Sequence, residues 1–138
     1  DRFRGELPVP LLHIVEATVG AAAAKSPEGS WLLSTSATRE SRIYPRYARE
    51  NGCRFLEPSD AQQGRAQESL TLVKANRIPE AGKVLRGLIE ELWEGESLPV
   101  VTACTELPLA YAASGLPADR EISSLEALSK ACLDFLYN

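Results

Sequence analysis

Two clusters of small polar residues follow short apolar runs of the kind that form buried strands. Residues 34–38 (Ser-Thr-Ser-Ala-Thr) follow the run 31–33, and residues 102–106 (Thr-Ala-Cys-Thr-Glu) follow the run 98–101. Hydroxyl groups and backbone N–H groups in such turns bind carboxylates and other small anions. Because ligands bind beyond the carboxyl ends of parallel strands, the two clusters predict a site for a small anion.

Cys104 is the cysteine whose neighbours favour chemistry. It lies at a predicted strand end between hydroxyl residues and Glu106, where backbone N–H groups could lower the pKa of its thiol and favour the thiolate. An inert strand-end thiol is the alternative interpretation. Cys53, at the start of a short strand, and Cys132, on an apolar helix stripe, are interpreted as structural thiols. The wide spacing of the three cysteines argues against a zinc site, and the size of the chain argues against a disulfide framework.

The remaining candidate side chains have ordinary structural interpretations. His13, the sole histidine, has no nucleophile signature beside it and is expected to be a hydrogen-bonded structural residue at a strand end. Lys74 near the end of a predicted helix is expected to be solvated. Arginines at helical spacing indicate an exposed helix face, with an anion-binding surface as the alternative; they are Arg39, Arg42, Arg46 and Arg49.

The elements that must position these residues alternate along the chain. Strands are predicted at residues 9–14, 31–34, 53–56 and 98–103, with a weaker strand pattern at 121–122. Helices are predicted at residues 16–25, 43–51, 59–75 and 79–93, and from Ser123 to the C-terminus. This alternation is typical of βαβ units. We therefore expect an α/β, Rossmann-like or flavodoxin-like layered fold with a mainly parallel four-stranded sheet flanked by helices.

Local signals mark several helix ends. Asn51-Gly52 predicts a left-handed C-cap, Ser59 predicts an N-cap, and Ser123 with Glu126 predicts a capping box. Pro45 is expected in the first turn of its helix. The C-terminal helix carries an apolar stripe that consists of Leu125, Leu128, Cys132, Phe135 and Leu136.

The composition excludes several classes of protein. The 138 residues are 44% apolar and 25% charged, which is typical of one folded domain rather than a disordered chain. A net charge of −4 provides no basic surface for nucleic acid or acidic membranes. No apolar run approaches the ~20 residues of a membrane span, and no signal peptide or nucleotide-binding motif is present. A cytoplasmic protein without metal or cofactor is expected.

Four segments, in order, resemble the aspartate/glutamate racemase superfamily, the cofactor-independent amino-acid racemases. Residues 103–109 (Ala-Cys-Thr-Glu-Leu-Pro-Leu) resemble its second cysteine motif. Residues 10–18 resemble the segment that enters its second lobe, and residues 72–76 resemble its lysine-bearing helix end. Residues 32–38, with Ser41 and Tyr44, resemble its hydroxyl-rich turn. Only the cysteine motif is specific alone, but together the segments cover essentially the whole chain.

The resemblance implies racemisation without pyridoxal phosphate. In that chemistry a thiolate removes the Cα proton of the amino acid, and a thiol returns a proton to the opposite face. The resemblance implies that Cys104 is one of the two catalytic cysteines and that Thr105 lies beside it. It further implies that Thr35 and Thr38 line the carboxylate site and that Lys74 supplies a positive charge.

Two further site candidates follow from the same resemblance. Glu106 stands where glutamate racemases usually have a histidine after the Cys-Thr pair, which favours an aspartate-racemase-like branch. Its role is open between substrate contact and structural hydrogen bonding. Thr18, at the end of the segment 10–18, is the second candidate.

One family feature has no counterpart in the sequence. The family builds its site between two similar lobes, and the first lobe supplies a cysteine in a Cys-Asn-Thr type motif. The chain starts at Asp1, contains no Met and lacks that motif. We therefore expect residues 15–113 to form the second lobe, with residues 1–14 and 114–138 as flanking segments that normally complete the first lobe. Such a chain is incomplete for two-base racemisation, and a homo-oligomer or association with the missing N-terminal part is expected.

Other functions stay open at the level of the sequence. The leading hypothesis is a racemase for aspartate, glutamate or a related amino acid. A second is another enzyme of the superfamily, of the arylmalonate decarboxylase, hydantoin racemase or maleate isomerase type. A third is a non-catalytic binding domain derived from a racemase.

Overall fold

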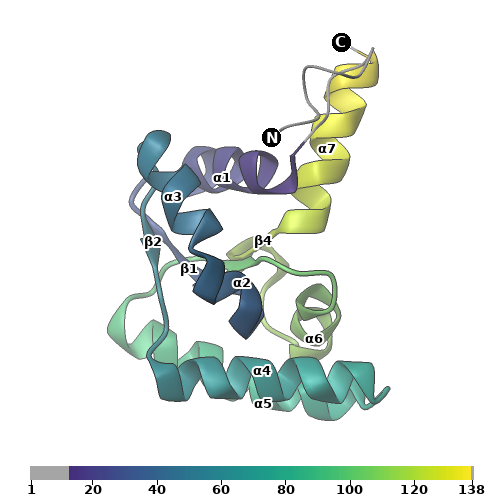
Figure 1. The fold of residues 1–138 in the computed structure, drawn as a ribbon. Coiled ribbons are helices and arrows are strands. Elements are labelled where there is room, and N and C mark those ends of the chain that lie inside the picture. The colour runs from purple at the N-terminus through teal and green to yellow at the C-terminus, as the bar shows by residue number, and fades with distance from the viewer. Residues whose placement is uncertain (1–12, 138) are drawn as a thin grey trace.

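The computed structural model describes residues 13–137, which form a four-stranded parallel sheet between two layers of helices (Figure 1). The strands are β1 (Ser30–Leu33), β2 (Phe55–Leu56), β3 (Val100–Thr102) and β4 (Glu121–Ser123). Their order across the sheet is β2-β1-β3-β4, and each neighbouring pair is parallel. The predicted α/β fold with a parallel four-stranded sheet is thus confirmed.

The strand order creates a switch point between β1 and β3. The chain leaves β1 and first forms β2 on one side of it, then returns to form β3 on the other side. Connections that diverge in this way leave a crevice at the carboxyl ends of the two central strands. Leu33 pairs with Thr102 at that end of the sheet, so the polar residues after both strands are neighbours.

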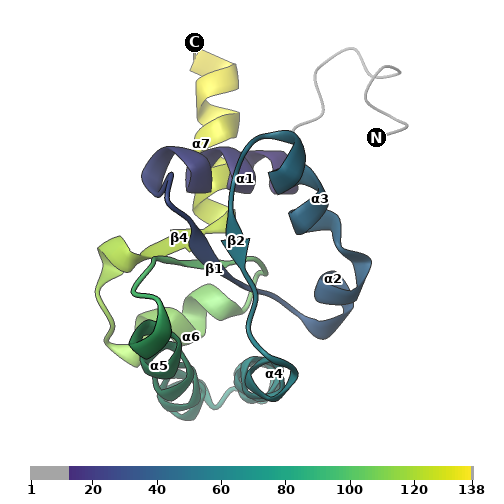
Figure 2. The same cartoon turned by 90° about the vertical axis from the view of Figure 1, so that its left-hand side faces the viewer.

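Helices cover the two faces of the sheet (Figures 1 and 2). The first face carries α1 (Ile14–Lys25), α3 (Ile43–Glu50) and α7 (Ser124–Tyr137). The second carries α4 (Asp60–Lys74), α5 (Ile78–Gly95) and α6 (Leu107–Ser114). The short helix α2 (Ser36–Ser41) follows β1 directly, and a 3-10 turn covers Ala118–Arg120.

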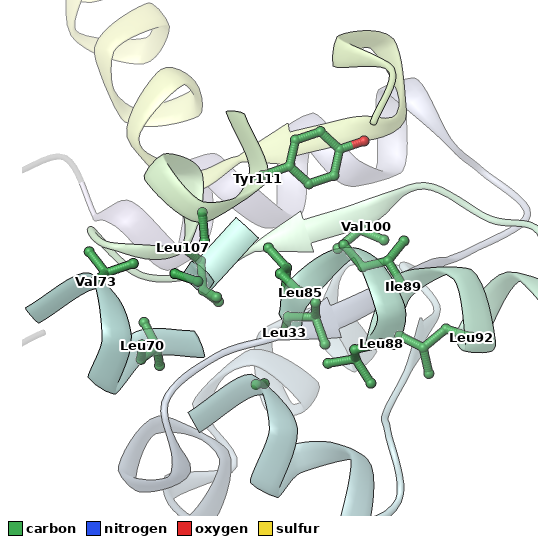
Figure 3. Packing of buried hydrophobic residues seen from close by; sticks show 13 residues of the cluster. Leu33, Leu70, Val73, Leu85, Leu88, Ile89, Leu92, Val100, Leu107 and Tyr111 are labelled. Atoms are coloured by element: carbon green, nitrogen blue, oxygen red, sulfur yellow. The ribbon is translucent and has the colours of Figure 1, made fainter. Parts of the chain in front are cut away.

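Each layer of helices has its own apolar core. Alternate residues of one strand enter different cores, because successive side chains point to opposite faces of a sheet. Val100 packs with the α4, α5 and α6 residues, whereas Val101 packs with α1 and α3. Figure 3 shows the first core, in which the predicted α5 stripe lies buried. That stripe comprises Leu85, Leu88, Ile89 and Leu92.

Several predicted helix ends are confirmed. Ser59 caps α4, and its hydroxyl accepts the Gln62 N–H while the Gln62 side chain accepts the Ser59 N–H, which completes a capping box. Gly52 has a left-handed φ of 66° after α3. The Ser123 hydroxyl accepts the Glu126 N–H at the start of α7.

The start of the described chain corrects one prediction. A strand at residues 9–14 is wrong where it can be checked, because Ile14 is the first residue of α1 and His13 is its N-cap. The His13 ring accepts the Val15 N–H through Nδ1, a capping hydrogen bond that favours the start of α1 at Ile14. The rest of that strand, residues 9–12, lies outside the described residues.

Four observed elements differ from expectation elsewhere. The weak pattern at 121–122 is the true edge strand β4, which pairs with β3. Helices α2 and α6 have no predicted counterpart. Helix α2 ends at Arg42, whose left-handed φ of 59° separates it from α3. The predicted stripe of α7 is only partly covered, since Leu125, Phe135 and Leu136 are exposed.

Candidate active site

The two polar clusters lie side by side at the carboxyl edge of the sheet. The Ala103 N–H donates to the Leu33 carbonyl oxygen at 2.8 Å, which continues the β1–β3 ladder beyond the strands. Residues 34–38 and 103–106 therefore leave the sheet next to each other, at the switch point. The expectation that both clusters share one edge is confirmed.

Thr35 and Thr38 form a hydroxyl pair at the start of α2. The Thr35 hydroxyl accepts the Thr38 N–H at 3.1 Å and donates to the Thr38 hydroxyl at 3.0 Å. Thr38 Oγ1 is used as an acceptor there, and its own proton has no acceptor among residues 13–137. Thr38 therefore has a hydrogen-bond donor to offer a ligand.

Two glutamines on α4 anchor the turn that carries these hydroxyls. The Gln63 side-chain amide donates to the Ser34 carbonyl oxygen at 3.0 Å, in a buried position. The Gln67 side-chain oxygen accepts the Ser36 N–H at 3.1 Å. Sequence reasoning missed both glutamines, because nothing in the periodicity of α4 marks them as partners of a loop.

Cys104 is partly buried in the loop just before α6. Its Sγ accepts the Leu107 N–H at 3.3 Å. Burial raises the pKa of the Cys104 thiol, and the Leu107 and Glu106 N–H groups lower it. The negative charge of Glu106 raises this pKa, the positive charge of Lys74 lowers it, and the balance lies above the ordinary value. The expected thiolate is therefore wrong, because desolvation outweighs the N–H groups, and Cys104 is a thiol at neutral pH.

Lys74 reaches the same region from the last turn of α4. Its charge acts on the Cys104 thiol, and its side chain is exposed. Within the described part of the chain its ammonium group has no hydrogen-bond or ion-pair partner. A cation in this setting is available to a ligand carboxylate.

Thr105 and Glu106 pair with each other. The exposed Thr105 hydroxyl donates to the Glu106 carboxylate at 2.7 Å. Among residues 13–137 the Thr105 hydroxyl has no other hydrogen-bond partner. The paired Glu106 carboxylate lies close enough to Cys104 for its charge to affect the thiol. Structural hydrogen bonding is thus one role that Glu106 has in the structure.

Thr18 is fully buried, and its hydroxyl donates to the Ile14 carbonyl oxygen at 2.7 Å. Its neighbour Tyr44 was not among the predicted site residues. Burial raises the pKa of the Tyr44 phenol, the nearby Thr18 side chain lowers it, and negative charge on Cys104 raises it. Tyr44 therefore lies within reach of both Thr18 and the Cys104 charge. The hydroxyl-rich segment around Ser41 was the one sequence signal that included Tyr44.

A pocket of about 470 Å³ opens between these elements. Helices α1, α2 and α3 and the residue that precedes Cys104 each contribute to its wall. The lining residues are His13, Ile14, Val15, Ala37, Thr38, Ser41, Ile43, Tyr44 and Ala103. The pocket thus joins Thr38 to the start of α1 and to Ala103, the residue before Cys104. The other predicted site residues do not line it; they are Cys104, Thr35, Lys74, Thr105, Glu106 and Thr18.

The arginine face and the other cysteines lie away from this pocket. Arg39 pairs with Asp60 at 3.1 Å, and Arg42 pairs with Glu57 at 2.6 Å. These carboxylates occupy two of the four arginines, which argues against an anion site. The prediction of one exposed helix face is wrong, because Arg39 lies on α2, Arg42 separates α2 from α3, and Arg46 and Arg49 lie on α3. Cys53 lines a separate hollow beside β2, and all three cysteines are free thiols.

Two further properties concern the described residues alone. No group of three or more His, Cys, Asp or Glu side chains within residues 13–137 is arranged to hold a metal ion. None of the helices in the same range is both long and apolar enough to cross a membrane.

Comparisons with known proteins agree with the fold. An aspartate racemase homologue from Pyrococcus horikoshii OT3 superposes with a TM-score of 0.83 at 22% identity, over 100% of this chain and 61% of that protein. An aspartate racemase from Picrophilus torridus superposes with a TM-score of 0.71 at 27% identity, over 89% of this chain and 51% of that protein. The chain therefore spans about half to two thirds of the solved structures it resembles.

Sequence comparison points the same way. An uncharacterized protein encoded in the pnlA 3' region of Pectobacterium carotovorum subsp. carotovorum is 28% identical over 99 residues, which are 72% of this chain and 66% of that protein. The model of the Asp/Glu/Hydantoin racemase family matches residues 1–130. That match covers nearly the whole sequence and includes both polar clusters of the site. The chain belongs to the Asp/Glu/hydantoin racemase family.

Proposed function

We propose that this chain carries one half of a cofactor-independent racemase site for aspartate, glutamate or a related amino acid. The observation that carries the proposal is the setting of Cys104. A partly buried thiol lies at the sheet switch point, with the Leu107 N–H on its sulfur and the charge of Lys74 in reach. A proton donor between hydrogen-bond donors and a cation suits a substrate that develops negative charge.

Cys104 is the proposed acid–base group on one face of the substrate. In the protonation step the S–H bond breaks and a Cα–H bond forms, which leaves a thiolate. The Leu107 N–H and the Lys74 ammonium group then stabilise that thiolate. In the opposite direction the thiolate takes the Cα proton, and the carbanion charge passes to the carboxylate of the substrate.

The carboxylate is the group that the polar side chains of the site would bind. Thr38 has an unused donor, Thr35 orients it, and Lys74 is an unpaired cation within the described residues. Thr105 and Glu106 complete the proposed rim beside the thiol. These donors would stabilise the charge that moves onto the carboxylate when the Cα proton leaves.

The second acid–base group is proposed to come from outside the lobe described here. Of the cysteines in the described residues, Cys104 is the one at this site, since Cys53 lines another hollow and Cys132 lies on α7. We propose that residues 15–113 form the second lobe together with the edge strand β4 (Glu121–Ser123), which pairs with β3, and that the flanking segments 1–14 and 124–138 contribute to the first lobe. A reducing, cytoplasmic location suits a catalyst that depends on free thiols.

The test is protection of Cys104 from alkylation by aspartate. The 138-residue chain is treated with iodoacetamide, and the modification of each cysteine is measured by mass spectrometry with and without L- or D-aspartate or glutamate. Slower alkylation of Cys104, with unchanged rates at Cys53 and Cys132, is expected. Equal rates at Cys104 with and without each amino acid would contradict the proposal.

A second candidate is single-thiol decarboxylation of the arylmalonate decarboxylase type. The raised pKa of the Cys104 thiol favours it, because that reaction needs one proton donor for the carbanion left by loss of CO₂. Release of CO₂ from an arylmalonate, abolished by Cys104→Ala, would support this candidate. No release, together with protection by aspartate, would favour the racemase half-site.

A further inference from the structure

We propose that His13 binds a carboxylate of the substrate through a hydrogen bond from Nε2. This inference rests on the proposed function, and it assigns to the only histidine a role other than capping α1. Four observations carry it: the wall of the pocket, the fixed orientation of the ring, the donors still available in the pocket, and the charge of its surroundings.

His13 contributes to the wall of the 470 Å³ pocket, together with Thr38, Tyr44 and Ala103. Ala103 directly precedes Cys104, and Tyr44 is close enough for the Cys104 charge to affect its pKa. A ligand in this pocket therefore lies between His13 and the region of the thiol. The imidazole is only partly exposed, so a ligand that reaches it is partly desolvated.

The orientation of the His13 ring is fixed from two sides. Nδ1 accepts the Val15 N–H at 3.1 Å, and the ring stacks on Tyr47 with centroids 5.4 Å apart and an interplanar angle of 19°. Because Nδ1 is an acceptor, the neutral ring carries its proton on Nε2. The side chain is thus a preorganised donor, and Nε2 has no partner among residues 13–137.

One of the other polar groups of the pocket is occupied. The Ser41 hydroxyl donates to the Thr38 carbonyl oxygen at 2.6 Å and accepts the Ile43 N–H at 3.3 Å. Within the described residues, the side-chain donors left to a ligand in the pocket are His13 Nε2, the Thr38 hydroxyl and the Tyr44 phenol.

The surroundings of His13 favour an anion. None of the residues that line the pocket is acidic, and Glu16, the acidic residue in the first turn of α1, is not part of the lining. His13 caps the 12-residue helix α1, so the positive end of the α1 dipole lies at the same wall. A carboxylate is the group of an amino-acid substrate that matches a donor, a positive helix end and an absence of acidic side chains in the lining.

The test separates binding from capping with two variants. His13→Asn keeps a good N-cap side chain but loses Nε2, whereas His13→Ala loses both functions. Aspartate affinity is measured from the protection of Cys104 against iodoacetamide, and helix capping from the thermal unfolding midpoint. We expect both variants to bind aspartate about tenfold more weakly or worse, since a hydrogen bond to a charged group is lost. Only His13→Ala is expected to unfold at a clearly lower temperature.

The outcomes distinguish the inference from the proposed function. Wild-type affinity in a folded His13→Asn variant would overturn the inference and leave the proposed function intact. Absence of protection in the wild-type chain would instead contradict the proposed function itself, and the inference with it. Thr38→Val serves as the positive control, because it removes another available donor of the pocket.

Discussion

At the scale of single residues, the environment of Cys104 decides its chemistry. Burial raises the pKa of the thiol, and the two N–H groups and Lys74 reverse only part of that rise. The sulfur is therefore protonated at neutral pH, yet it has hydrogen-bond donors that stabilise it whenever it loses its proton. A group of this kind serves as the acid in one direction of a proton transfer and as the base in the other.

The raised pKa predicts how Cys104 alkylation depends on pH. Because the thiolate is the nucleophile and burial raises the pKa of this thiol above its ordinary value, the rate should still rise above about pH 8.5. Lys74→Met removes a positive charge and should raise the pKa further, which slows alkylation at pH 8. Lys83→Met, an exposed lysine of α5, is the matched control and should leave the rate unchanged. The measurement is site-resolved mass spectrometry, and a rate that levels off well below pH 9 would contradict the prediction.

The proposed half-site predicts one-sided proton exchange. With one acid–base group, the chain should exchange the Cα proton of one aspartate enantiomer for solvent deuterium without forming the other enantiomer. Proton NMR in deuterium oxide measures the exchange. Cys104→Ala should slow it by about a hundredfold or more, the usual contribution of a positioned acid–base group, whereas Cys53→Ala should not. Exchange that persists in Cys104→Ala would remove Cys104 from the mechanism.

At the scale of elements, close approach of helices holds the site in place. Helix α6 begins just after Cys104 and packs on α5, which in turn packs on α4, the helix that carries Lys74. At Gly82 of α5 an added Cβ would lie 2.7 Å from the backbone of Ala113 in α6. That separation leaves no room for a side chain, so glycine sets the distance between the two helices.

This contact predicts opposite effects of one substitution at two helical glycines. Gly82→Ala should destabilise the chain by about 1–3 kcal/mol, because the backbone of α6 must move to admit the methyl group. Gly64→Ala in α4 meets nothing within 4 Å and should stabilise by about 0.5–1 kcal/mol through helix propensity. Urea unfolding measures both changes, and a stabilised Gly82→Ala variant would contradict the packing argument.

At the scale of the whole molecule, α7 starts beside α1 and β4, and its C-terminal half extends away from the sheet and the other helices (Figure 1). Its last two turns expose Leu133 by 56% and Leu136 by 67%, together with Phe135 and Tyr137. Adjacent apolar side chains of this kind are typical of surfaces that another protein segment covers. The proposed cover is a second copy of the chain or the first lobe.

The exposed end of α7 predicts self-association of the isolated chain. Sedimentation velocity should show a species larger than a monomer at micromolar concentration. The double variant Leu133→Glu and Leu136→Glu should shift it to the monomer. Leu109→Glu, at a leucine of α6 that is 52% exposed, is the control and should not. A monomeric wild-type chain would show that α7 does not pair with a second copy.

Much of the fold could be predicted from local pattern. Two apolar runs, around Leu32 and Val101, predicted buried strands, and apolar residues at a 3.6-residue spacing predicted α5. Such patterns can be read from sequence because the buried face of a strand or helix needs apolar residues at the repeat of that element. Helix α2 could not be separated from α3 in this way, because the break lies at Arg42, a residue type that rarely adopts a left-handed conformation. The strand predicted at residues 9–14 was wrong at its end, because His13 caps α1 and Ile14 begins that helix although the apolar run there favours a strand.

The sequence by itself determined that hydroxyls and a cysteine follow two buried strands, because strand ends and residue types are local properties. Tertiary structure alone decided that those strands are neighbours, that Lys74 acts on Cys104 and that Tyr44 and His13 belong to the same pocket. It also decided that the Cys104 thiol is protonated at neutral pH. Desolvation and charge depend on what surrounds a group in space, and residues distant in the sequence supply those surroundings.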